Sequence, residues 1–331
     1  MRCPLISVII LNWNGKEFIK TCLDSVFKTK YPNYEVIVVD NGSTDGSVEF
    51  IKSKYSKVKL IRNRKNLGYA KGNNIGLKSS KGKYLVALSN DTKVDPNWLK
   101  ELVRVAESDN SIGICSSKQL YFDRPCIINS TGIVVFKDGT ARNRGLGEKD
   151  EGQYDKIEEV FGAPGASTFF RREMLNKIGL FDSDYFSYQE EFDLAWRARL
   201  CGWKCVYVPN ALVFHRVGAT SRKYPNIAAY YMHRNRLWTI VKNFSISSIF
   251  IYLPYIFLYE LGSVLYSLLT QNFIHIKAIF DALKGIPKVL KKRKKIQKMR
   301  TVPESEITKY LLTPPFLNII SRILKGEKVG G

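Results

Sequence analysis

Short apolar segments alternate with segments of helical period over about the first 110 residues of the chain. Each apolar segment is rich in Val, Ile, Leu or Tyr and ends at polar or turn-forming residues. These segments cover residues 6–11, 35–39, 58–61 and 84–88. Alternation of this kind is typical of a parallel sheet whose strands are joined by crossover helices. The pattern therefore predicts an α/β fold in which helices flank a sheet.

One helix start is predicted in detail just after the fourth of these segments. Asp95 suits the N-cap position, and Pro96 suits the first helical position, where a missing N–H costs nothing. Trp98, Leu102 and Val105 then fall on one helical face. We expect this helix to bury that face in the core.

The periodicity changes over the following hundred residues or so. Between about residues 111 and 160, short strands alternate with Gly-rich turns. Helical character returns over residues 171–178 and 190–200, and two strand-like segments follow, CVYVP and ALVFH. A further helix is predicted over residues 230–242. We expect residues 1–243 to form one domain around a mixed sheet.

A long apolar segment follows this domain. Residues 245–269 are enough to cross a bilayer, which takes about 20 apolar residues, but Pro254 and Glu260 lie inside the segment. A single span would also place the basic run at 284–300 outside, against the tendency of Lys and Arg to stay cytoplasmic. We therefore favour a re-entrant or interfacial helical hairpin broken near Pro254, with a single span as the alternative.

The charge of the chain is strongly positive and unevenly distributed. The net charge is +22, and residues 284–300 contain nine Lys or Arg and no acid. A helical stripe of apolar residues, with cations beside it, precedes this run: Phe273, Ile276, Ile279, Phe280 and Leu283. The basic run has no interleaved aromatic residues and belongs to no nucleic-acid-binding module, so we expect no nucleic-acid partner. We expect an anionic membrane surface as its partner, with residues 244–300 as membrane-associated helices and 301–331 as a C-terminal tail.

The N-terminus and the cysteines indicate in which cellular compartment the chain is expected to work. The sequence MRCPLISVIILNW runs directly into a predicted strand and lacks the three regions of a cleavable signal, so we expect the catalytic part on the cytoplasmic face of the membrane. The six cysteines form no C-x-x-C pair, and we interpret them as reduced core residues.

Two aspartates are expected at the carboxyl ends of strands, where open α/β sheets bind ligands. Asp40 lies in VIVVDNGSTDGS, and a carboxylate there can accept a hydrogen bond from the imide N–H of a pyrimidine base. Asp91 lies in YLVALSNDT, where it can hold a divalent cation that neutralises a diphosphate. Alternatively, Asp40 only caps a loop, and Asp91 is only a turn residue. Gly68, in LGYAKGNNIGL, fits either a nucleotide-side element or close helix packing.

Acidic residues also gather at the start of the predicted 190–200 helix. Glu190, Glu191 and Asp193 exceed what a helix dipole needs, and crowded carboxylates raise one another's pKa, which suits a general base. His215 follows a strand and precedes a polar loop, so it is either a structural histidine or a third contact for a metal ion.

Taken together, these segments resemble the family 2 glycosyltransferases of GT-A fold, which have a Rossmann-like mixed sheet flanked by helices. Within that family they resemble the rhamnosyltransferase-like group that builds bacterial and archaeal surface polysaccharides. The resemblance covers about residues 5–243. It is carried by SVIILNWNG, VIVVDNGSTDGS, NLGYAKGNNIGL, LSNDT, QEEFDLAWR and YYMHRNRLWTIVKN.

The resemblance implies a role for each matching residue. Glu191 is expected to be the catalytic base, beside Glu190, and Asp91 and His215 are expected to hold Mg²⁺ or Mn²⁺. The residues expected to bind the nucleotide are Asn12, Asp40, Asn66, Gly68, Asn73 and Asn90. The residues expected toward the acceptor are Gly165, Ala166, Arg172 and Asp193.

The sequence departs from the family pattern at two places. Ser89 and Asn90 occupy the first two positions of the metal-binding D-x-D, which leaves Asp91 as the carboxylate ligand. Glu191 replaces the more usual aspartate and extends the base by one methylene.

The expected function is inverting transfer of a sugar from a nucleotide-diphosphate sugar to a hydroxyl of a glycan or lipid-linked acceptor, in the synthesis of cell-surface polysaccharide or glycoconjugate. A nucleotidyltransferase would need a Gly-rich, basic first loop, whereas this chain has LNWNGKEF there. A membrane-tethered protein that binds nucleotide sugars without catalysis remains the alternative.

Overall fold

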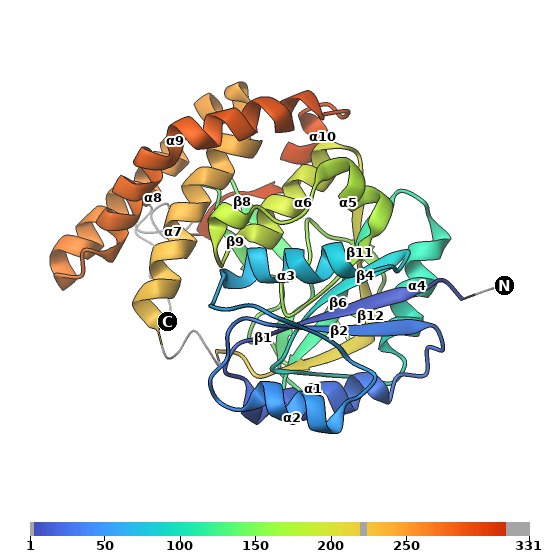
Figure 1. Ribbon diagram of the computed structural model, residues 1–331. Helices are drawn as coiled ribbons and strands as arrows, with labels where there is room; N and C mark the ends of the chain where they lie inside the picture. Colours follow the sequence, from blue (N-terminus) through green and yellow to red (C-terminus); the bar gives the residue numbers. More distant parts are fainter. Residues whose placement is uncertain (1–2, 219–223, 316–331) are drawn as a thin grey trace.

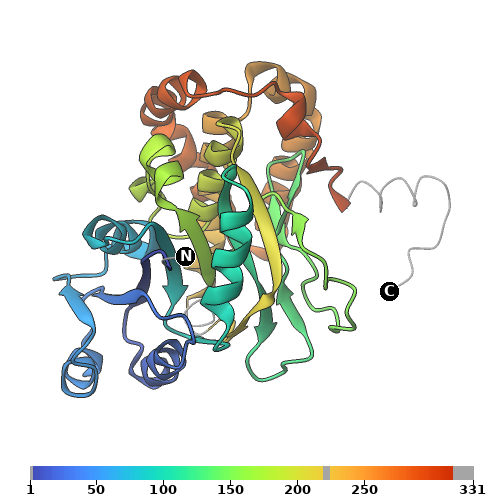
Figure 2. The same ribbon diagram turned by 90° about the vertical axis from the view of Figure 1, so that its right-hand side faces the viewer.

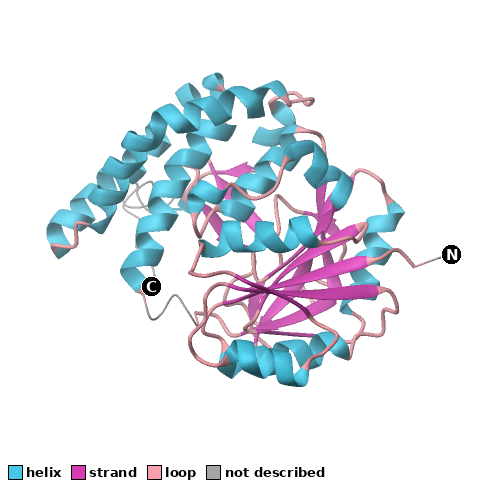
Figure 3. Cartoon of the chain, viewed as in Figure 1, coloured by secondary structure: helices cyan, strands magenta, loops and turns pink. Residues whose placement is uncertain are grey.

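The computed structural model describes residues 3–218 and 224–315. In these residues a ten-stranded mixed sheet has helices on both faces, and a smaller three-stranded sheet lies beside it (Figures 1 and 3). The strands are β1 (Ile6–Asn12), β2 (Tyr34–Asp40), β3 (Lys59–Arg62), β4 (Tyr84–Ser89), β5 (Thr92–Val94), β6 (Ile112–Tyr121), β7 (Ile128–Ser130), β8 (Ile133–Phe136), β9 (Ala141–Asn143), β10 (Glu158–Glu159), β11 (Ser167–Arg171), β12 (Lys204–His215) and β13 (Leu311–Leu312). The helices are α1 (Lys16–Phe27), α2 (Ser47–Lys54), α3 (Gly68–Ser79), α4 (Trp98–Ser108), α5 (Arg172–Ile178), the 3₁₀ turn η1 (Ser183–Tyr185), α6 (Glu190–Leu200), α7 (Pro225–Asn243), α8 (Ile246–Thr270), α9 (Ile274–Lys298) and α10 (Ser305–Thr308).

The large sheet has the order β10-β12-β6-β11-β4-β1-β2-β3, with β5 paired to β12 and β7 to β6. The block β4-β1-β2-β3 is parallel, β11 runs antiparallel to both β4 and β6, and β12 runs parallel to β6. The register places Asn12 opposite Asp40 and Leu11 opposite Ser89, so the carboxyl ends of β1, β2 and β4 meet at one edge. The predicted α/β fold is confirmed, because all four expected strands lie in the parallel block.

The parallel strands are apolar on both faces because helices cover both. In β1, Ile9 packs with α3 on one side, while Val8 and Ile10 pack with α1 and α4 on the other. Buried parallel strands need this continuous apolar character. Figure 2 shows α4 lying along the sheet beside β12.

The helix predicted after Asp95 begins two residues later than expected. Trp98 is the first residue of α4, and Asp95 accepts hydrogen bonds before the helix, from Asn97 N–H to its carboxylate (2.8 Å) and from Trp98 N–H to its carbonyl (3.0 Å). The predicted N-cap at Asp95 is therefore wrong, because the 95–97 segment closes as a turn first. The predicted face is confirmed, since Trp98, Leu102 and Val105 are all buried.

The C-terminal helices form a hairpin, but it does not turn where the sequence predicted. Helix α8 runs unbroken through Pro254, so the break expected there is wrong, and the chain reverses at Gln271, which has a left-handed backbone (φ 53°). A proline removes one helical hydrogen bond. Other segments hold α8 on both sides of the proline: Ser248 donates to Glu304, and Glu260 pairs with Arg236 of α7.

Helix α8 packs on the domain along one side only. Ile256 belongs to the main core cluster, and Glu260 also accepts a hydrogen bond from His233 Nε2 on α7 (2.8 Å). The opposite side exposes large apolar residues, including Phe250, at 71% exposed, and Phe257, at 61%. In the described part of the chain, α8 is the one helix long and apolar enough to cross a membrane by length and composition.

Helix α9 packs along α7, and the chain then returns to the domain. The Trp238 indole donates to the Ala282 carbonyl (3.0 Å), and Gly285 lies so close to that ring that a Cβ would collide with it. Beyond α9, β13 joins the small sheet in the order β13-β8-β9, so residues 311–312 pair with β8. Residues 316–331 of the expected tail lie outside the described residues.

All six cysteines are free thiols. Cys22, Cys115, Cys201 and Cys205 are buried as expected, whereas Cys3 and Cys126 are exposed, so the prediction of core positions is wrong for these two. Cys3 precedes the first strand and Cys126 lies in the turn before β7, where no layer covers either residue.

Candidate active site

A cavity of about 970 Å³ opens where the carboxyl ends of β1 and β4 face the start of α6 and the first turns of α7. It collects most of the residues singled out in the sequence. The predicted residues that line it are Asn66, Gly68, Asn90, Asp91, Gly165, Ala166, Glu190, Glu191 and His215. Residues from five separate segments thus meet in one place, as expected for a ligand site at the edge of an α/β sheet.

Asp91 and His215 lie together on one wall of this cavity. Asp91 follows β4 and His215 ends β12, and the β5–β12 ladder, which pairs His215 with Thr92, brings them together. His215 Nε2 is 3.5 Å from Asp91 Oδ1, and His215 Nδ1 is 3.1 Å from Asn129 Oδ1. Nδ1 thus faces the Asn129 side chain, and Nε2 faces Asp91.

The pair has the chemistry of a partial metal site. Asp91 Oδ1 is buried and has no hydrogen-bond partner, which is costly unless another group binds it. Among the described residues, no group of three or more His, Cys, Asp and Glu is placed to hold a metal ion. Asp91 and His215 therefore fit a divalent cation whose remaining ligands are oxygens of a bound molecule, as is common for Mg²⁺ beside phosphates.

Glu190 and Glu191, in the first turn of α6, form a second wall of the cavity. Glu190 is 1% exposed, and its Oε2 has no hydrogen-bond partner. Burial raises the pKa of Glu191 to about 7. Burial, together with the charge of Glu191, raises the pKa of Glu190 well above its usual range. Burial thus favours the protonated form of both carboxyl groups, and the raised pKa of Glu191 suits a base that works near neutral pH.

The segment before β11 sets the space available to Glu191. A Cβ on Gly165 would collide with Glu191 Oε1, so any larger residue there would displace the carboxylate. The Tyr69 hydroxyl donates to the Gly165 carbonyl (2.6 Å) and fixes this segment against α3.

Asn12 and Asp40 lie behind the cavity wall instead of on it. Both are fully buried, and Asn12 Nδ2 donates to Asp40 Oδ1 (3.0 Å). The other Asp40 oxygen accepts from the N–H of Ser43 (3.0 Å), and Asn12 Oδ1 accepts from Asn90 Nδ2 (2.8 Å). This network shapes the strand ends, while the next residue, Asn41, reaches the cavity.

Three other predicted residues also lie away from the cavity. Asn73 is buried in α3, with its amide donating to the Tyr69 carbonyl (3.0 Å). Arg172 donates to Ser80 Oγ (2.9 Å) at the far end of β11. Asp193 is fully buried and pairs with Arg197 (3.0 Å) and Lys242 (2.8 Å), because the fourth residue of α6 points into the protein.

The cavity also contains residues that the sequence analysis missed. They are Trp13, Asn41, Tyr69, Gln119, Asn129, Arg142, Tyr188, Gln189, Tyr224 and Tyr231. Trp13 and Asn41 each follow a strand that had been predicted, so strand ends alone could have indicated them. Asn129 and Arg142 come from the irregular 111–160 region, where no periodicity marks a position.

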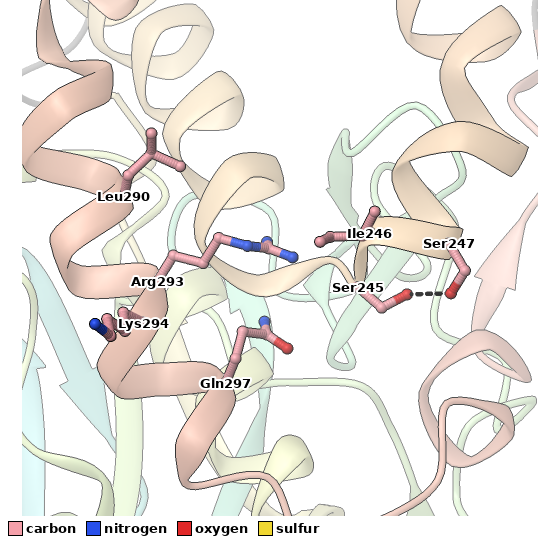
Figure 4. A pocket seen from close by; sticks show the side chains of 7 residues that line it. All are labelled: Ser245, Ile246, Ser247, Leu290, Arg293, Lys294 and Gln297. Atoms are coloured by element: carbon pink, nitrogen blue, oxygen red, sulfur yellow. Dashed lines mark hydrogen bonds between the residues drawn. The ribbon is translucent and has the colours of Figure 1, made fainter.

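A second hollow, of about 500 Å³, lies between the first turn of α8 and the C-terminal half of α9 (Figure 4). Arg293 points into it beside Ser245 and Gln297. The Arg293 guanidinium donates to the carbonyls of Val241 and Phe244 (both 2.6 Å). This arginine thus joins α9 to the end of α7, and no acidic residue lines the hollow.

Comparison with known proteins places the chain in a family. The model of "Glycosyl transferase family 2" matches residues 7–179, more than half of the sequence. The chain belongs to this family. The match includes Asp40 and Asp91 and ends before Glu190, so the acidic wall of this family 2 chain is described by its geometry alone.

Curated relatives of this family 2 chain are similar over part of their length. An uncharacterized glycosyltransferase of Haemophilus influenzae is 34% identical over 114 residues, which is 34% of this chain and 35% of the relative. The poly-beta-1,6-N-acetyl-D-glucosamine synthase of Staphylococcus epidermidis is 23% identical over 217 residues, 65% of this chain and 50% of the relative. The chain thus spans about a third to a half of these relatives.

Solved structures share the fold. The S. aureus TarS fragment 1-349 in complex with UDP-GlcNAc has a TM-score of 0.59 at 17% identity, over 98% of this chain and 93% of the fragment. The mannosyltransferase PcManGT of Pyrobaculum calidifontis, in complex with GDP-Man and Mn2+, has a TM-score of 0.54 at 15% identity, over 98% of this chain and 81% of that protein. At this identity the likeness establishes the GT-A fold, as the sequence predicted.

Proposed function

We propose that this chain is an inverting glycosyltransferase that moves a sugar from a nucleotide-diphosphate sugar to a hydroxyl of a glycan or lipid-linked acceptor. The observation that carries the proposal is that Asp91 with His215, and Glu190 with Glu191, line the same cavity. One wall suits the charged diphosphate, and the other suits removal of a proton. Bound UDP-GlcNAc and GDP-Man in the structural neighbours are consistent with such a donor.

Glu191 is the proposed catalytic base. The acceptor hydroxyl gives its proton to the Glu191 carboxylate while its oxygen bonds to the anomeric carbon. The bond between that carbon and the diphosphate oxygen breaks in the same step, and the nucleoside diphosphate leaves. Attack from the side opposite the leaving group inverts the configuration. The pKa of Glu191, raised to about 7 by burial, matches a base that works near neutral pH.

Asp91 and His215 are the proposed ligands of Mg²⁺ or Mn²⁺. A divalent cation bound there would neutralise charge that develops on the departing diphosphate. Asp91 Oδ1, which has no hydrogen-bond partner, and the position of His215 Nε2 beside it support this assignment. Mn2+ in the structure of PcManGT is consistent with it.

The nucleotide is proposed to lie on the β1–β4 side of the cavity. Asn66, Gly68 and Asn90 line the cavity, and Asn41 adds a side chain that the prediction lacked. Asn12 and Asp40 support them from behind the wall. Gly165 and Ala166 flank Glu191 and are proposed to face the acceptor.

We also propose that the chain works at the cytoplasmic face of a membrane. Its domains would be residues 1–243 for catalysis and 244–300 for membrane association, followed by the segment from 301. The outer side of α8 is apolar, and α9 exposes Phe280 and Leu283 beside lysines, a pattern that suits an anionic lipid surface. Because Glu260 holds α8 to buried Arg236 of α7, lipid cannot surround α8 in this conformation, which favours a helix lying along the membrane.

A place in the rhamnosyltransferase-like group, and in cell-surface polysaccharide or glycoconjugate synthesis, is part of the proposal. The segments QEEFDLAWR and YYMHRNRLWTIVKN support it. The test is a panel of nucleotide sugars incubated with Mg²⁺ or Mn²⁺, with and without candidate acceptors. We expect released nucleoside diphosphate to require both the metal ion and one class of donor, and to increase with acceptor. Binding of donor with no acceptor-dependent release would contradict the proposed activity.

A further inference from the structure

The loop before Glu190 has an unusual backbone. Phe186, Tyr188 and Gln189 all have positive φ, at 64°, 68° and 71°, although none is a glycine. Residues with side chains rarely adopt this region, and such conformations persist where the surrounding structure imposes them. The loop leads directly into Glu190 and Glu191, so whatever imposes its shape also sets where these carboxylates point.

Asn235 of α7 contacts this loop at three backbone carbonyls. Its side chain is fully buried, and Nδ2 is within hydrogen-bond distance of the carbonyls of Tyr185 (2.9 Å), Ser187 (2.9 Å) and Tyr188 (2.8 Å). The remaining carbonyl of this stretch, that of Phe186, accepts from the N–H of Ala70 (3.1 Å). Four successive carbonyls are thus held, three of them by one amide group.

Arg234 fixes the orientation of that amide. Its Nε and Nη2 donate to Asn235 Oδ1 at 3.0 Å and 2.8 Å, so the amide oxygen must face Arg234 and Nδ2 must face the loop. Arg234 Nη2 also donates to the carbonyls of Asp184 (3.0 Å) and Tyr185 (3.2 Å). The residue next to Asn235 on α7 therefore fixes the orientation of the Asn235 amide.

Ion pairs from α7 and α9 hold the beginning of the loop. Lys242 Nζ is 2.6 Å from Asp182 Oδ2, and Lys288 Nζ is 2.6 Å from Asp184 Oδ1. Lys292 of α9 pairs with both of these aspartates. The segment 182–189 is thus fixed at its start by cations and at its end by Asn235.

We propose that Asn235 is a positioning residue for sugar transfer: by holding the carbonyls of Tyr185, Ser187 and Tyr188, it places Glu190 and Glu191 in the cavity. The inference rests on the proposed glycosyltransferase activity. Asn235 itself does not line the cavity, so it acts through the loop. Its loss should lower kcat more than donor binding, because Asn41, Asn66 and Asp91 belong to other segments.

The main test compares Asn235→Ser with Asn243→Ser. Asn243 is a matched control, since it lies on the same helix, is 1% exposed, and donates to Asp193 Oδ1 (2.9 Å) without touching the loop. The full chain is used, and kcat, the KM for donor, the Kd for nucleoside diphosphate and Tm are measured. We expect Asn235→Ser to lower kcat about 100-fold, the effect that displacing a catalytic group by about 1 Å can have. Its Kd should change less than about threefold, and Asn243→Ser should keep kcat within about threefold of wild type.

A second variant keeps the inference testable if Asn235→Ser does not fold. Arg234→Lys retains the positive charge and Asn235 but loses the two contacts that orient the amide. We expect kcat to fall about tenfold with an unchanged Kd. Unchanged kcat in a folded Asn235→Ser, or in Arg234→Lys where the first variant is insoluble, would overturn the inference. So would an equal loss of kcat in Asn243→Ser.

The two proposals fail in distinguishable ways. If wild-type protein releases no nucleoside diphosphate with any donor and acceptor, the proposed function fails and the role of Asn235 in it falls too. If wild type is active and Asn235→Ser retains kcat, the positioning role alone is wrong.

Discussion

The two walls of the cavity are built in different ways. Asp91 and His215 lie at strand ends, and the pairing of β5 with β12 places them within 3.5 Å of each other. Glu190 and Glu191 follow an irregular loop whose shape depends on α7 and α9, between about 45 and 100 residues further along the chain. The first wall is therefore fixed by hydrogen bonds within a sheet, and the second by tertiary contacts from the C-terminal helices.

The walls differ in chemistry as well. The strand-end wall offers a buried carboxylate oxygen that has no hydrogen-bond partner, with an imidazole beside it, which suits a cation. In the acidic wall, burial raises the pKa of both glutamates, which suits proton transfer. The strand ends can thus hold a cation in place. The acidic wall, in contrast, needs a loop that positions two carboxyl groups where they are buried.

The largest expected effect is on the acidic wall. Glu191→Gln keeps the shape of the side chain but removes the base, and we expect transfer to fall about 1000-fold, within the range for general-base catalysis. Glu173→Gln, at an exposed glutamate in the first turn of α5, is the control and should behave as wild type. The measurement is kcat from released nucleoside diphosphate. Near-normal turnover by folded Glu191→Gln would show that Glu191 is not the catalytic base.

A smaller loss is expected from the strand-end wall. Asp91→Asn removes the charge that would hold the cation, and we expect kcat to fall about 100-fold, since His215 and the phosphates could still retain some metal. Donor affinity should lose its dependence on Mn²⁺, measured by titration with and without the ion. Asp123→Asn, at an exposed aspartate whose side chain is 75% exposed, is the control. Unchanged metal dependence in Asp91→Asn would contradict the proposed division between the walls.

The pH dependence separates the walls further. Burial raises the pKa of Glu191 to about 7, and a base acts only when deprotonated. At saturating donor, kcat should therefore rise about tenfold per pH unit below about pH 7 and level off above it. The profile is measured from pH 5.5 to 8.5 at constant ionic strength. A flat profile across this range would show that Glu191 does not limit the reaction as a base.

The smallest effect on catalysis is expected at the outer side of the hairpin. Phe250→Ser and Phe257→Ser change exposed residues of α8 that touch neither wall, so kcat on a water-soluble acceptor should stay within about twofold. Binding to liposomes containing anionic lipid should weaken, because exposed aromatic area no longer enters the lipid. Co-sedimentation measures this, with exposed Lys57→Ser as a control outside the hairpin. Equal liposome binding by all variants would show that the outer side of α8 does not contribute to membrane binding.

The sheet was readable from the sequence because its strands carry a strong local signal. The run 84–88 is apolar at every position and the run 6–11 at every position but Ser7, and both faces of these strands are covered in the structure. The same hydrophobic pattern predicted that Asp91 lies at the end of a strand and that the acidic residues of α6 lie at the start of a helix. The sequence did not show which of two neighbouring residues would face the cavity. In the structure, Asp40 is enclosed by Asn12 and the N–H of Ser43, and Asn41 faces the cavity.

Tertiary packing decided the features that had no local signal. Pro254 predicted a break, yet α8 is continuous, with Ser248 and Glu260 held by other segments on either side of the proline. Asp193 was expected beside the acceptor, yet Arg197 and Lys242 surround it in the interior. In both cases the deciding partners lie on other elements or face inward, which periodicity does not report.

The sequence by itself determined the α/β fold, the family resemblance and the order of the chemical segments, because these depend on residue type and spacing along the chain. The tertiary structure decided which of these residues share the cavity, and how the acidic wall is held. Its control by Asn235 and by the lysines of α9 depends on hydrogen bonds and ion pairs between distant segments. Such contacts exist only once the helices have packed.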